Sequence, residues 1–365
     1  MNMATFDRLA AYFSCVWELH MPVIGADELR HKTAGLFCSL GVPPEDAAHV
    51  AELLVEANLC GHDSHGVIRI PQYARFIRQG QIQPGSTLEV TVDCPAVAVV
   101  DGRMNLGAVT MLRVLDMARH RADRAGAYTI FVRNCHHVGR LGAYTSRAAR
   151  AGYASMMAVN SPGSRCVAPW GGIDRRLGTN PLSLAVPAPE FPLVLDMTTS
   201  VVAEGKIRVH YHEGRPLPEG WIIDAEGNPT TDARAFYAQP PGALLPLGGH
   251  VGYKGFGLAL LLDIFCGVLS GMGCLRPDLT AGQNGVWLTL FRLGAWVSRP
   301  FFLEEVQKLC DWIRSSRRQG GVAEILLPGE WEARTMRERL RHGIYIPEET
   351  WRQILAVASE VGYSW

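Results

Sequence analysis

Apolar positions between residues 43 and 59 recur at helical spacing. The i, i+3, i+4, i+7 pattern is kept by Val50, Leu53, Leu54 and Ala57. Pro44 suits the first turn of a helix, and Gly61 suits a position just beyond its end. The pattern therefore predicts an amphipathic helix that leads directly into the polar, glycine-flanked segment at 61–66, where a site could lie.

After residue 95, short apolar runs alternate with stretches of helical periodicity. Strands are predicted at 96–100, 128–132, 153–159, 182–186, 193–197 and 286–290. Helices are predicted at 109–124, 144–150, 254–269, 303–317 and 347–361. Alternating strands and helices are typical of an α/β unit. The Pro-rich turn between 186 and 193 also favours antiparallel pairing of the two strands beside it.

The stretch from 207 to 249 is rich in Pro and Gly and has little periodicity, which predicts a long loop region. Because both chain ends are helical and the middle is sheet-rich, we expect an α/β domain inserted in a discontinuous helical domain. The expected parts are an extension at 1–23, a helical substrate-side domain from 24–95 and 253–365, and the inserted domain at 96–252, whose sheet the strand at 286–290 can join. Residues 1–20 carry no motif, so we expect them to be dispensable for activity.

Charge and composition favour a small-molecule ligand. The chain has 35 basic and 35 acidic residues, so no net field would attract nucleic acid or an anionic membrane. Its nine cysteines are scattered and form no C-x-x-C pair, which indicates reduced thiols in the cytoplasm. The apolar runs are shorter than a membrane span, and the N-terminus lacks the pattern of a signal peptide.

Glycine-rich phosphate-binding motifs are mostly missing. Neither G-x-G-x-x-G nor G-x-x-x-x-G-K-[ST] occurs after a predicted strand, which argues against a Rossmann domain. The run G-G-H-V-G-Y-K-G at 248–255 does lead into a predicted helix, and such an approach can hold an anion such as a pyrophosphate.

Ser64, His65 and Arg69 place a hydroxyl, an imidazole and a guanidinium in one short stretch. Arginine can clamp a carboxylate with two hydrogen bonds, and histidine can donate a proton near neutral pH. The same residues could instead form a capped helix start with solvated side chains. The spacing alone leaves both interpretations open.

The run H-H-V-G-R at 136–140 follows a predicted strand and precedes a helix, where ligands commonly meet α/β units. A histidine there could act as an acid or base, or could simply be a satisfied turn residue. Pairs such as His62 with His65 could bind a metal, but no H-E-x-x-H or supporting carboxylate accompanies them, so no metal is expected. Ser64 is not in the G-x-S-x-G motif of a serine hydrolase.

Taken together, these segments resemble the malate/L-lactate dehydrogenase family, which includes sulfolactate and ureidoglycolate dehydrogenases. The run G-H-D-S-H-G-V-I-R at 61–69, with Tyr73 and the segment 80–84, matches the opening signature of the family. The resemblance continues in order at 137–140, 160–163, 177–181, 195–200, 205–206, 229–232, 245–249 and 327–330.

This resemblance implies a non-Rossmann nicotinamide-binding α/β domain with a mixed sheet, a discontinuous helical domain, and a homodimer. It implies a hydride transfer between NAD or NADP and a small 2-oxo/2-hydroxy carboxylate. Catalytic roles map to His137, His65 and Ser64. Substrate-binding roles map to Arg69, Tyr73 and Lys206. Cofactor contacts map to Asn160, Ser161, Leu195, Asp196, Met197, Gly249, His250, Pro328, Gly329 and Glu330.

In these roles His137 is the acid or base, an imidazole for which we expect a pKa near 7, and Arg69 binds the substrate carboxylate. A branch of the family reduces cyclic imines and lacks a histidine at the position of His137, with the histidine of the Ser-His-Gly segment as donor. The presence of His137 favours carbonyl chemistry over an imine reductase, and the intact His65 and Arg69 disfavour a non-catalytic binding protein. The segments 273–284 and 295–300 depart from the family pattern, so the substrate side chain and the choice between NAD and NADP stay open.

Overall fold

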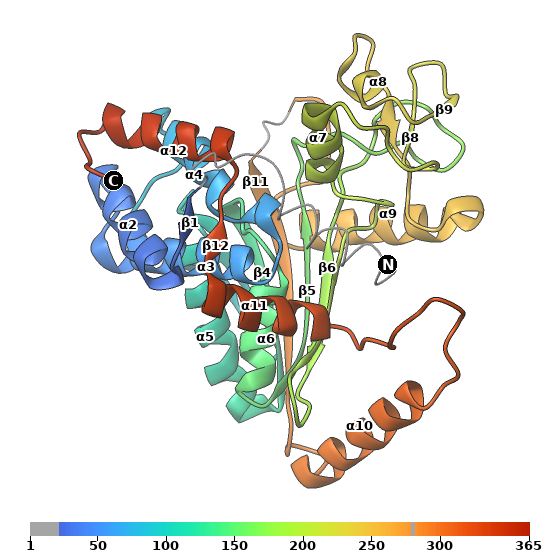
Figure 1. Cartoon of the computed structure of the whole chain (residues 1–365). Coiled ribbons are helices and arrows are strands. Elements are labelled where there is room, and N and C mark those ends of the chain that lie inside the picture. The colour runs from blue at the N-terminus through green and yellow to red at the C-terminus, as the bar shows by residue number, and fades with distance from the viewer. Residues whose placement is uncertain (1–21, 279–281) are drawn as a thin grey trace.

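The computed structural model describes residues 22–278 and 282–365, so the predicted extension at 1–20 lies outside the described residues. The two ends of the described chain meet in a two-stranded antiparallel sheet of β1 (Val23–Ile24) and β12 (Ile344–Tyr345). Helices from both ends gather around it, as the blue and red ribbons of Figure 1 show. They are α2 (Ala26–Ser39), α3 (Pro44–Leu59), α4 (Ile70–Arg78), α11 (Glu330–His342) and α12 (Glu348–Glu360).

The helix α3 begins and ends where its sequence predicts. Pro44 occupies its first turn, and Gly61 follows its end with a φ of +77°, a conformation that glycine adopts without a Cβ penalty. The predicted apolar face, with Val50 and Leu54, is buried in the main hydrophobic core. The helix is thereby fixed, and it determines where the polar segment after Gly61 starts.

A seven-stranded mixed sheet runs through the centre of the molecule in the order β2-β3-β4-β11-β5-β6-β7. Its strands are β2 (Glu89–Asp93), β3 (Val97–Asp101), β4 (Ala127–His136), β5 (Tyr153–Asn160), β6 (Leu182–Val186), β7 (Leu193–Met197) and β11 (Gln283–Arg292). β3 and β4 are parallel, whereas β6 and β7 are antiparallel as predicted. The expected mixed α/β fold is confirmed. β11 lies between β4 and β5, and the domain boundaries stay a prediction.

Helices cover the two faces of this sheet unequally (Figure 1). The helices α5 (Gly107–Ala125) and α6 (Gly142–Arg150) pack on one face, and α9 (Tyr253–Gly267) packs on the other, against β5 and β11. Alternate residues of β4, namely Tyr128, Ile130 and Val132, are buried in the core on the α5 side. The period of two in the sequence of this strand therefore corresponds to the buried face.

The prediction of a long loop at 207–249 was wrong. This region holds α7 (Glu204–Glu213), α8 (Ala233–Tyr237) and a small antiparallel sheet of β8 (Ile222–Ile223), β9 (Pro229–Thr230) and β10 (Ala243–Leu244). Strands of two residues are too short to show an alternating pattern. α7 was hidden because Val209 and Tyr211 are apolar yet exposed, which blurs its helical periodicity.

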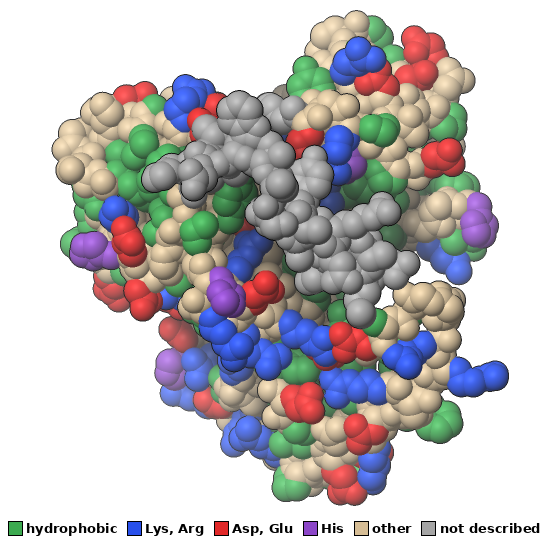
Figure 2. Space-filling model, viewed as in Figure 1, with side chains coloured by type: hydrophobic (Ala, Val, Ile, Leu, Met, Phe, Trp, Pro, Cys, Tyr) green, Lys and Arg blue, Asp and Glu red, His purple; other side chains and the backbone are tan. Residues whose placement is uncertain are grey.

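The remaining helix, α10 (Arg299–Arg314), extends from the end of β11 and stands apart from the body in Figure 1. Figure 2 shows basic and acidic side chains lying side by side over the face that carries α11 and α10, and two ion pairs there join Arg334 to Glu324 and Arg314 to Glu190. Within 22–278 and 282–365, no helix is long and apolar enough to cross a membrane.

Candidate active site

The polar segment after α3 is a rigid turn built from two short 3-10 helices. They are η1 (Asp63–His65) and η2 (Val67–Arg69). Asn58 holds the turn from inside, because its Nδ2 donates to Asp63 Oδ1 at 2.7 Å. Arg339 of α11 donates to both oxygens of Asp63, at 2.7 and 3.1 Å. A Cβ at Gly66 would come within 2.2 Å of Asn58 Oδ1, so only glycine fits this close approach.

Ser64, His65, Arg69, Tyr73 and His137 come together in one cluster. The imidazole rings of His65 and His137 stack with their centroids 5.7 Å apart and an interplanar angle of 18°. Tyr73 Oη lies 2.7 Å from His137 Nδ1, and Ser64 Oγ lies 3.0 Å from His65 Nδ1. Thus η1, η2, α4 and the residue after β4 bring side chains that are up to 73 positions apart in sequence (64 to 137) to one place.

Arg69 has no acidic counterion in the described part of the chain. Its Nε donates to the carbonyl oxygen of Ser64 at 2.7 Å, and its Nη1 donates to Gln72 Oε1 at 2.9 Å. Burial lowers the pKa of Arg69 from its ordinary value, which reflects the cost of keeping an unpaired charge away from water. The cluster therefore has a surplus positive charge that an anionic ligand would neutralise.

Both stacked histidines resist protonation in the free protein. Burial, and then the charge of Arg69, lower the pKa of His65 to about 3. The same two causes hold the pKa of His137 well below its ordinary value. The expectation of a pKa near 7 for His137 is therefore wrong for the free protein, because burial and the neighbouring Arg69 guanidinium both disfavour a second positive charge.

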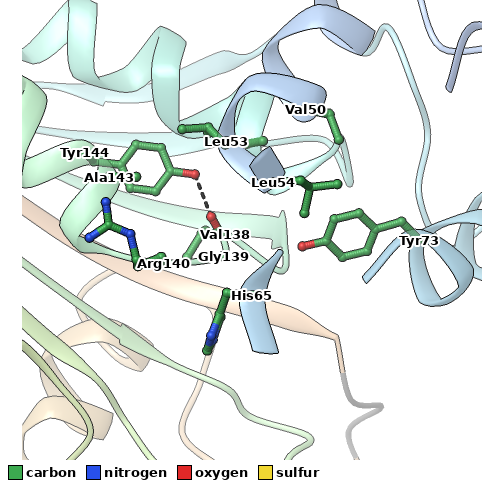
Figure 3. Close-up of a pocket in the computed structure, with 11 residues that line it drawn as sticks. Val50, Leu53, Leu54, His65, Tyr73, Val138, Gly139, Arg140, Ala143 and Tyr144 are labelled. Carbon is green, nitrogen blue, oxygen red and sulfur yellow. Dashed lines mark hydrogen bonds between the residues drawn. The ribbon is translucent and has the colours of Figure 1, made fainter. Parts of the chain in front are cut away.

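A small cavity lies beside this cluster (Figure 3). Its volume is about 10 Å³, which is room for roughly one water molecule. His65 and Tyr73 line one part of it, and apolar residues of α3 and α6 line most of the rest. The hydroxyl of Tyr144 donates to the carbonyl oxygen of Val138 at 2.6 Å, shown as the dashed line. This cavity is too small for a carboxylate substrate.

Two of the predicted cofactor segments meet at the edge of the sheet. The backbone N–H of Val194 donates to the carbonyl oxygen of Pro328 at 3.1 Å. Asp196 and Gly329 line a common cavity of about 40 Å³. The Asp196 carboxylate accepts a hydrogen bond from the backbone of Gly142, the first residue of α6, at 2.6 Å. Leu195 and Met197 flank Asp196 on β7.

The other predicted cofactor residues lie in different surroundings. Asn160 is fully buried, and its amide joins Asp263 at 3.0 Å and the backbone of Gly285 at 3.0 Å. Ser161 Oγ accepts from Asn284 at 2.9 Å. The Glu330 carboxylate accepts from the backbone of Leu327 at 3.0 Å and from Arg314 and Arg334 at 3.1 and 2.6 Å. Gly249 and His250 are exposed at the start of α9.

Lys206 is exposed on the first turn of α7, which faces the catalytic cluster. A Cβ placed on the neighbouring Gly205 would lie 3.0 Å from Ser64 Cβ, so α7 approaches the turn at 61–69 closely. The roles that the family resemblance implies for Lys206 and for the cofactor residues stay predictions.

These surroundings fit a nicotinamide dinucleotide. Carboxylates such as Asp196 suit ribose hydroxyls, and glycine-rich turns suit phosphate oxygens because the backbone can approach closely. At Gly139 and Gly249, which have φ values of +81° and +54°, no atom lies within 4 Å of an added Cβ. The backbone at both turns is therefore open to a ligand. Among residues 22–278 and 282–365, no cluster of three or more His, Cys, Asp or Glu could hold a metal ion.

Three positioning residues were missed in the sequence. Asn58 has a signal, because it is a polar residue at i+4 from Leu54 on the apolar face of α3, and it is buried. Gln72 and Arg339 have none: Gln72 is one of many polar residues on α4, and Arg339 acts across 276 sequence positions on Asp63. Only the folded chain brings them to the turn.

Comparison with known proteins places this arrangement in a family. The sequence pattern of the malate/L-lactate dehydrogenase family matches residues 24–355. A malate dehydrogenase of Pyrococcus horikoshii is 37% identical over 345 residues, covering 92% of this chain and 94% of the relative. Hydroxycarboxylate dehydrogenase B of Escherichia coli O157:H7 is 33% identical over 342 residues, covering 92% of this chain and 94% of the relative.

Solved structures agree with these relatives. The structure of the Pyrococcus horikoshii malate dehydrogenase superposes with a TM-score of 0.86 at 32% identity, covering 96% of this chain and 99% of the other. The delta1-piperideine-2-carboxylate reductase of Pseudomonas syringae pvar. tomato superposes with a TM-score of 0.78 at 26% identity, covering 92% and 100%.

The fold is shared with the hydroxy-acid dehydrogenases named above. The chain belongs to the malate/L-lactate dehydrogenase family. It is therefore an enzyme, and dehydrogenases of this family generally depend on nicotinamide.

Proposed function

We propose that this enzyme transfers a hydride between NAD or NADP and a small 2-oxo/2-hydroxy carboxylate of the malate, lactate, sulfolactate or ureidoglycolate type. The observation that carries the proposal is the half-buried Arg69, whose side chain donates to Ser64 and Gln72 and has no carboxylate partner in the described chain. It lies in a cluster with two imidazoles that burial and its charge keep neutral. A carboxylate substrate supplies the missing negative charge.

Arg69 is already aimed by its neighbours. Its Nε is held by the carbonyl oxygen of Ser64 and one terminal nitrogen by Gln72. The guanidinium has five N–H donors, so three remain for a substrate carboxylate. Because the fork is planar and pre-positioned, little freedom is lost when the carboxylate binds.

His137 handles the proton in this mechanism. Tyr73 Oη forms a hydrogen bond with His137 Nδ1. Burial raises the pKa of Tyr73, so the phenol stays protonated and donates to that nitrogen. The proton of the imidazole is then on Nε2, which is left to face the substrate oxygen. When a carboxylate neutralises Arg69, one of the causes that depress the pKa of His137 is removed, and the imidazole gains a proton more easily.

In the direction of reduction, the proton of His137 moves to the substrate oxygen, and the imidazole becomes neutral. A nicotinamide bound at the proposed cofactor segments would supply the hydride for the carbon that carries this oxygen. Ser64 and His65 lie beside the reacting group, and the stacked ring of His65 excludes water from one side of His137. Oxidation of the hydroxy acid uses the same residues in reverse, with neutral His137 as the base.

A substrate panel tests this proposal. Nicotinamide absorbance is followed with NADH and with NADPH against pyruvate, oxaloacetate, sulfopyruvate, oxoisovalerate and piperideine carboxylate. Turnover of at least one 2-oxo acid at a rate well above that of the imine supports the proposal. Turnover of the imine alone contradicts it.

The second candidate is a cyclic-imine reductase of the same family. It is favoured by the likeness to the delta1-piperideine-2-carboxylate reductase and by the hydrogen bond between Ser64 and His65, which orients a second imidazole. In that reaction His65 would donate the proton. The presence of His137, bonded to Tyr73, makes the carbonyl reaction our first choice.

The assembly and the compartment are part of the proposal. We propose a homodimer, as the family resemblance implies, working in the cytoplasm. The cytoplasmic location is supported by the eight cysteines of the described chain, all of which are free thiols.

A further inference from the structure

The first residues of β11 lie between the ends of two strands that lead to predicted site residues. β11 pairs antiparallel with both β4 and β5, so β4 and β5 run in the same direction and end at the same edge of the sheet (Figure 1). β4 ends at His136, one residue before His137, and β5 ends at Asn160, one residue before Ser161. The start of β11 is therefore placed between the proton donor proposed above and a predicted cofactor segment.

Asn284, the second residue of β11, joins these two strand ends. Its side chain is buried, and its Oδ1 accepts from the backbone N–H of Val138 at 3.0 Å. Its Nδ2 donates to the carbonyl oxygen of Asn160 at 3.0 Å and to Ser161 Oγ at 2.9 Å. The partners fix the orientation of the amide, because a backbone N–H needs an oxygen and a carbonyl oxygen needs an N–H. One buried amide thus binds both the residue after His137 and the predicted cofactor segment.

Val138 is held from two sides. The hydroxyl of Tyr144 donates to its carbonyl oxygen at 2.6 Å, and Asn284 accepts from its N–H. Val138 is itself buried, so an N–H that lost this partner would have no water to replace it. The backbone beside His137 therefore cannot turn without breaking a buried hydrogen bond, and the direction of the imidazole depends on Asn284.

The backbone around Asn284 is shaped for a close approach. A Cβ on Gly285 would come within 2.6 Å of Asn160 Oδ1, and the Gly285 N–H donates to that same oxygen at 3.0 Å. The register of β11 against β4 shifts between Asn284 and Val286, and Asn134, in the irregular stretch of β4, has a φ of +49°. Bulges re-aim side chains and are common next to active sites. The irregular pairing is consistent with a strand end that is shaped by the site.

We propose that Asn284 is a positioning residue, which fixes His137 relative to the segment that holds the nicotinamide. This inference rests on the proposed function, because it takes His137 as the proton donor and residues 160–161 as part of the cofactor site. The family resemblance assigns no role to Asn284, which lies in the segment 273–284 that departs from the family pattern. Hydride and proton go to neighbouring atoms of the substrate, so a displacement of about 1 Å between their donors can cost on the order of 10²-fold in rate.

Steady-state kinetics of the full-length enzyme measures this role, with the 2-oxo acid that the panel shows to be turned over fastest. Asn284→Ala should lower kcat roughly 10²-fold, while the KM values for nicotinamide and oxo acid change by less than about 3-fold. Deuterium at the transferred position of the reduced nicotinamide should slow kcat by a larger factor in the variant than in the wild type, because hydride transfer becomes the slow step. An unchanged kcat, or a rise in KM in place of the fall in kcat, overturns the proposal.

The matched control is Thr289→Val on the same strand. It removes a hydroxyl that bonds to Thr129 of β4 at 2.9 Å, away from the catalytic turn and the cofactor segment. This variant should keep the wild-type kcat and isotope effect. A fall in kcat equal to that of Asn284→Ala would mean that any lost bond in β11 has this effect, and would overturn the specific role of Asn284.

Asn284→Asp keeps the test decisive if Asn284→Ala does not fold. The ionised carboxylate still accepts from Val138 but turns an oxygen towards the carbonyl of Asn160, so kcat should fall. The protonated carboxyl can donate to that carbonyl as the amide does. The ratio of the variant kcat to the wild-type kcat should therefore rise as pH falls, and a ratio that stays constant with pH overturns the proposal.

Hydrogen exchange tests the link without turnover. The Val138 amide should exchange at least about 10-fold faster in folded Asn284→Ala than in the wild type, and Thr289→Val should leave it unchanged. Equal exchange in all three proteins overturns the inference. An enzyme that turns over only the imine contradicts the proposed function, whereas the exchange result still decides the link, so the two failures are distinguishable.

Discussion

The catalytic cluster around Arg69 and the buried residues Asn160 and Glu330 use their polar groups in opposite ways. The Glu330 carboxylate is saturated by a backbone N–H and two arginines, and the Asn160 amide by Asp263 and two backbone groups. Arg69 keeps a half-buried charge without a carboxylate partner in the described chain. Motif matching treats these residues alike, whereas the structure shows that the polar atoms of Asn160 and Glu330 are hydrogen-bonded within the chain and that Arg69 has no carboxylate partner among the described residues.

The largest effect is expected at the proton donor. His137→Ala should lower kcat for 2-oxo acid reduction by roughly 10²–10⁴-fold, because the proton then has no positioned source. His65→Ala should cost less, since His65 contacts Ser64 and stacks on His137 without holding the transferred proton. Steady-state measurement of kcat for the two variants shows which histidine contributes more to the rate. Near-wild-type kcat in His137→Ala with loss of activity in His65→Ala would move the imine-reductase assignment ahead.

The pH dependence of the wild type sharpens this assignment. The folded-state pKa of His137 is depressed, so the imidazole is neutral above that value and protonated only below it. For hydroxy-acid oxidation, which needs the neutral base, kcat/KM should therefore stay level as pH falls through 6.5. For reduction it should rise as pH falls across the same window. A change in kcat/KM centred near pH 6.5, for both oxidation and reduction, would show that the proton donor has an ordinary histidine pKa.

Substitution of Arg69 should weaken substrate binding. Arg69→Ala removes a charge-assisted contact, which corresponds to a loss of kcat/KM on the order of 2–4 kcal/mol, with the KM for nicotinamide nearly unchanged. Arg69→Lys should rescue only part of it, because an ammonium lacks the planar fork. Arg75→Ala, which removes an exposed arginine of the following helix α4, is the control. A fall in nicotinamide affinity in place of substrate affinity would contradict the role.

Substitution of Glu330 should lower the stability of the fold. Glu330→Gln replaces a buried carboxylate that accepts from two arginines, so the free energy of unfolding should fall by about 1–3 kcal/mol. Thermal unfolding measures this loss, and Glu338→Gln, an exposed change on the same helix, is the control. The KM for nicotinamide should change by less than about 3-fold. An unchanged Tm with a much higher nicotinamide KM would mean that Glu330 serves the cofactor directly.

Dialysis against a strong chelator should have no effect on turnover. Imidazole acid/base catalysis with a nicotinamide hydride does not require a metal. A loss of activity that zinc restores would revise the mechanism. The treated enzyme also needs an unchanged melting curve, so that a structural effect is not mistaken for a catalytic one.

The sequence could predict what depends on local spacing. The helix after Pro44, the strands around residues 130 and 157, and the segment 61–69 all followed from periodicity, turn residues and motif. What periodicity could not show is convergence across the chain. Arg339 reaches Asp63 and Tyr73 reaches His137 only after the core has formed, and β11 takes its place inside the sheet through pairing with β4 and β5.

The same limit applies to charge. Residue types suggested that His137 would titrate near pH 7, whereas burial and the neighbouring Arg69 lower its pKa in the folded chain. The missed helix α7 is a further case, since its exposed apolar residues conceal its period. In both cases the outcome depends on what surrounds a residue in three dimensions.

Binding of oxamate, a non-reducible mimic of a 2-oxo acid, tests the central claim most directly. Isothermal titration of the enzyme saturated with reduced nicotinamide is compared between wild type and Arg69→Ala. If Arg69 is the carboxylate site, the variant should bind oxamate at least about 30-fold more weakly. Binding to the wild type should also take up protons, because His137 gains a proton more easily once the oxamate carboxylate pairs with Arg69. Equal oxamate affinity in the two proteins would contradict the account.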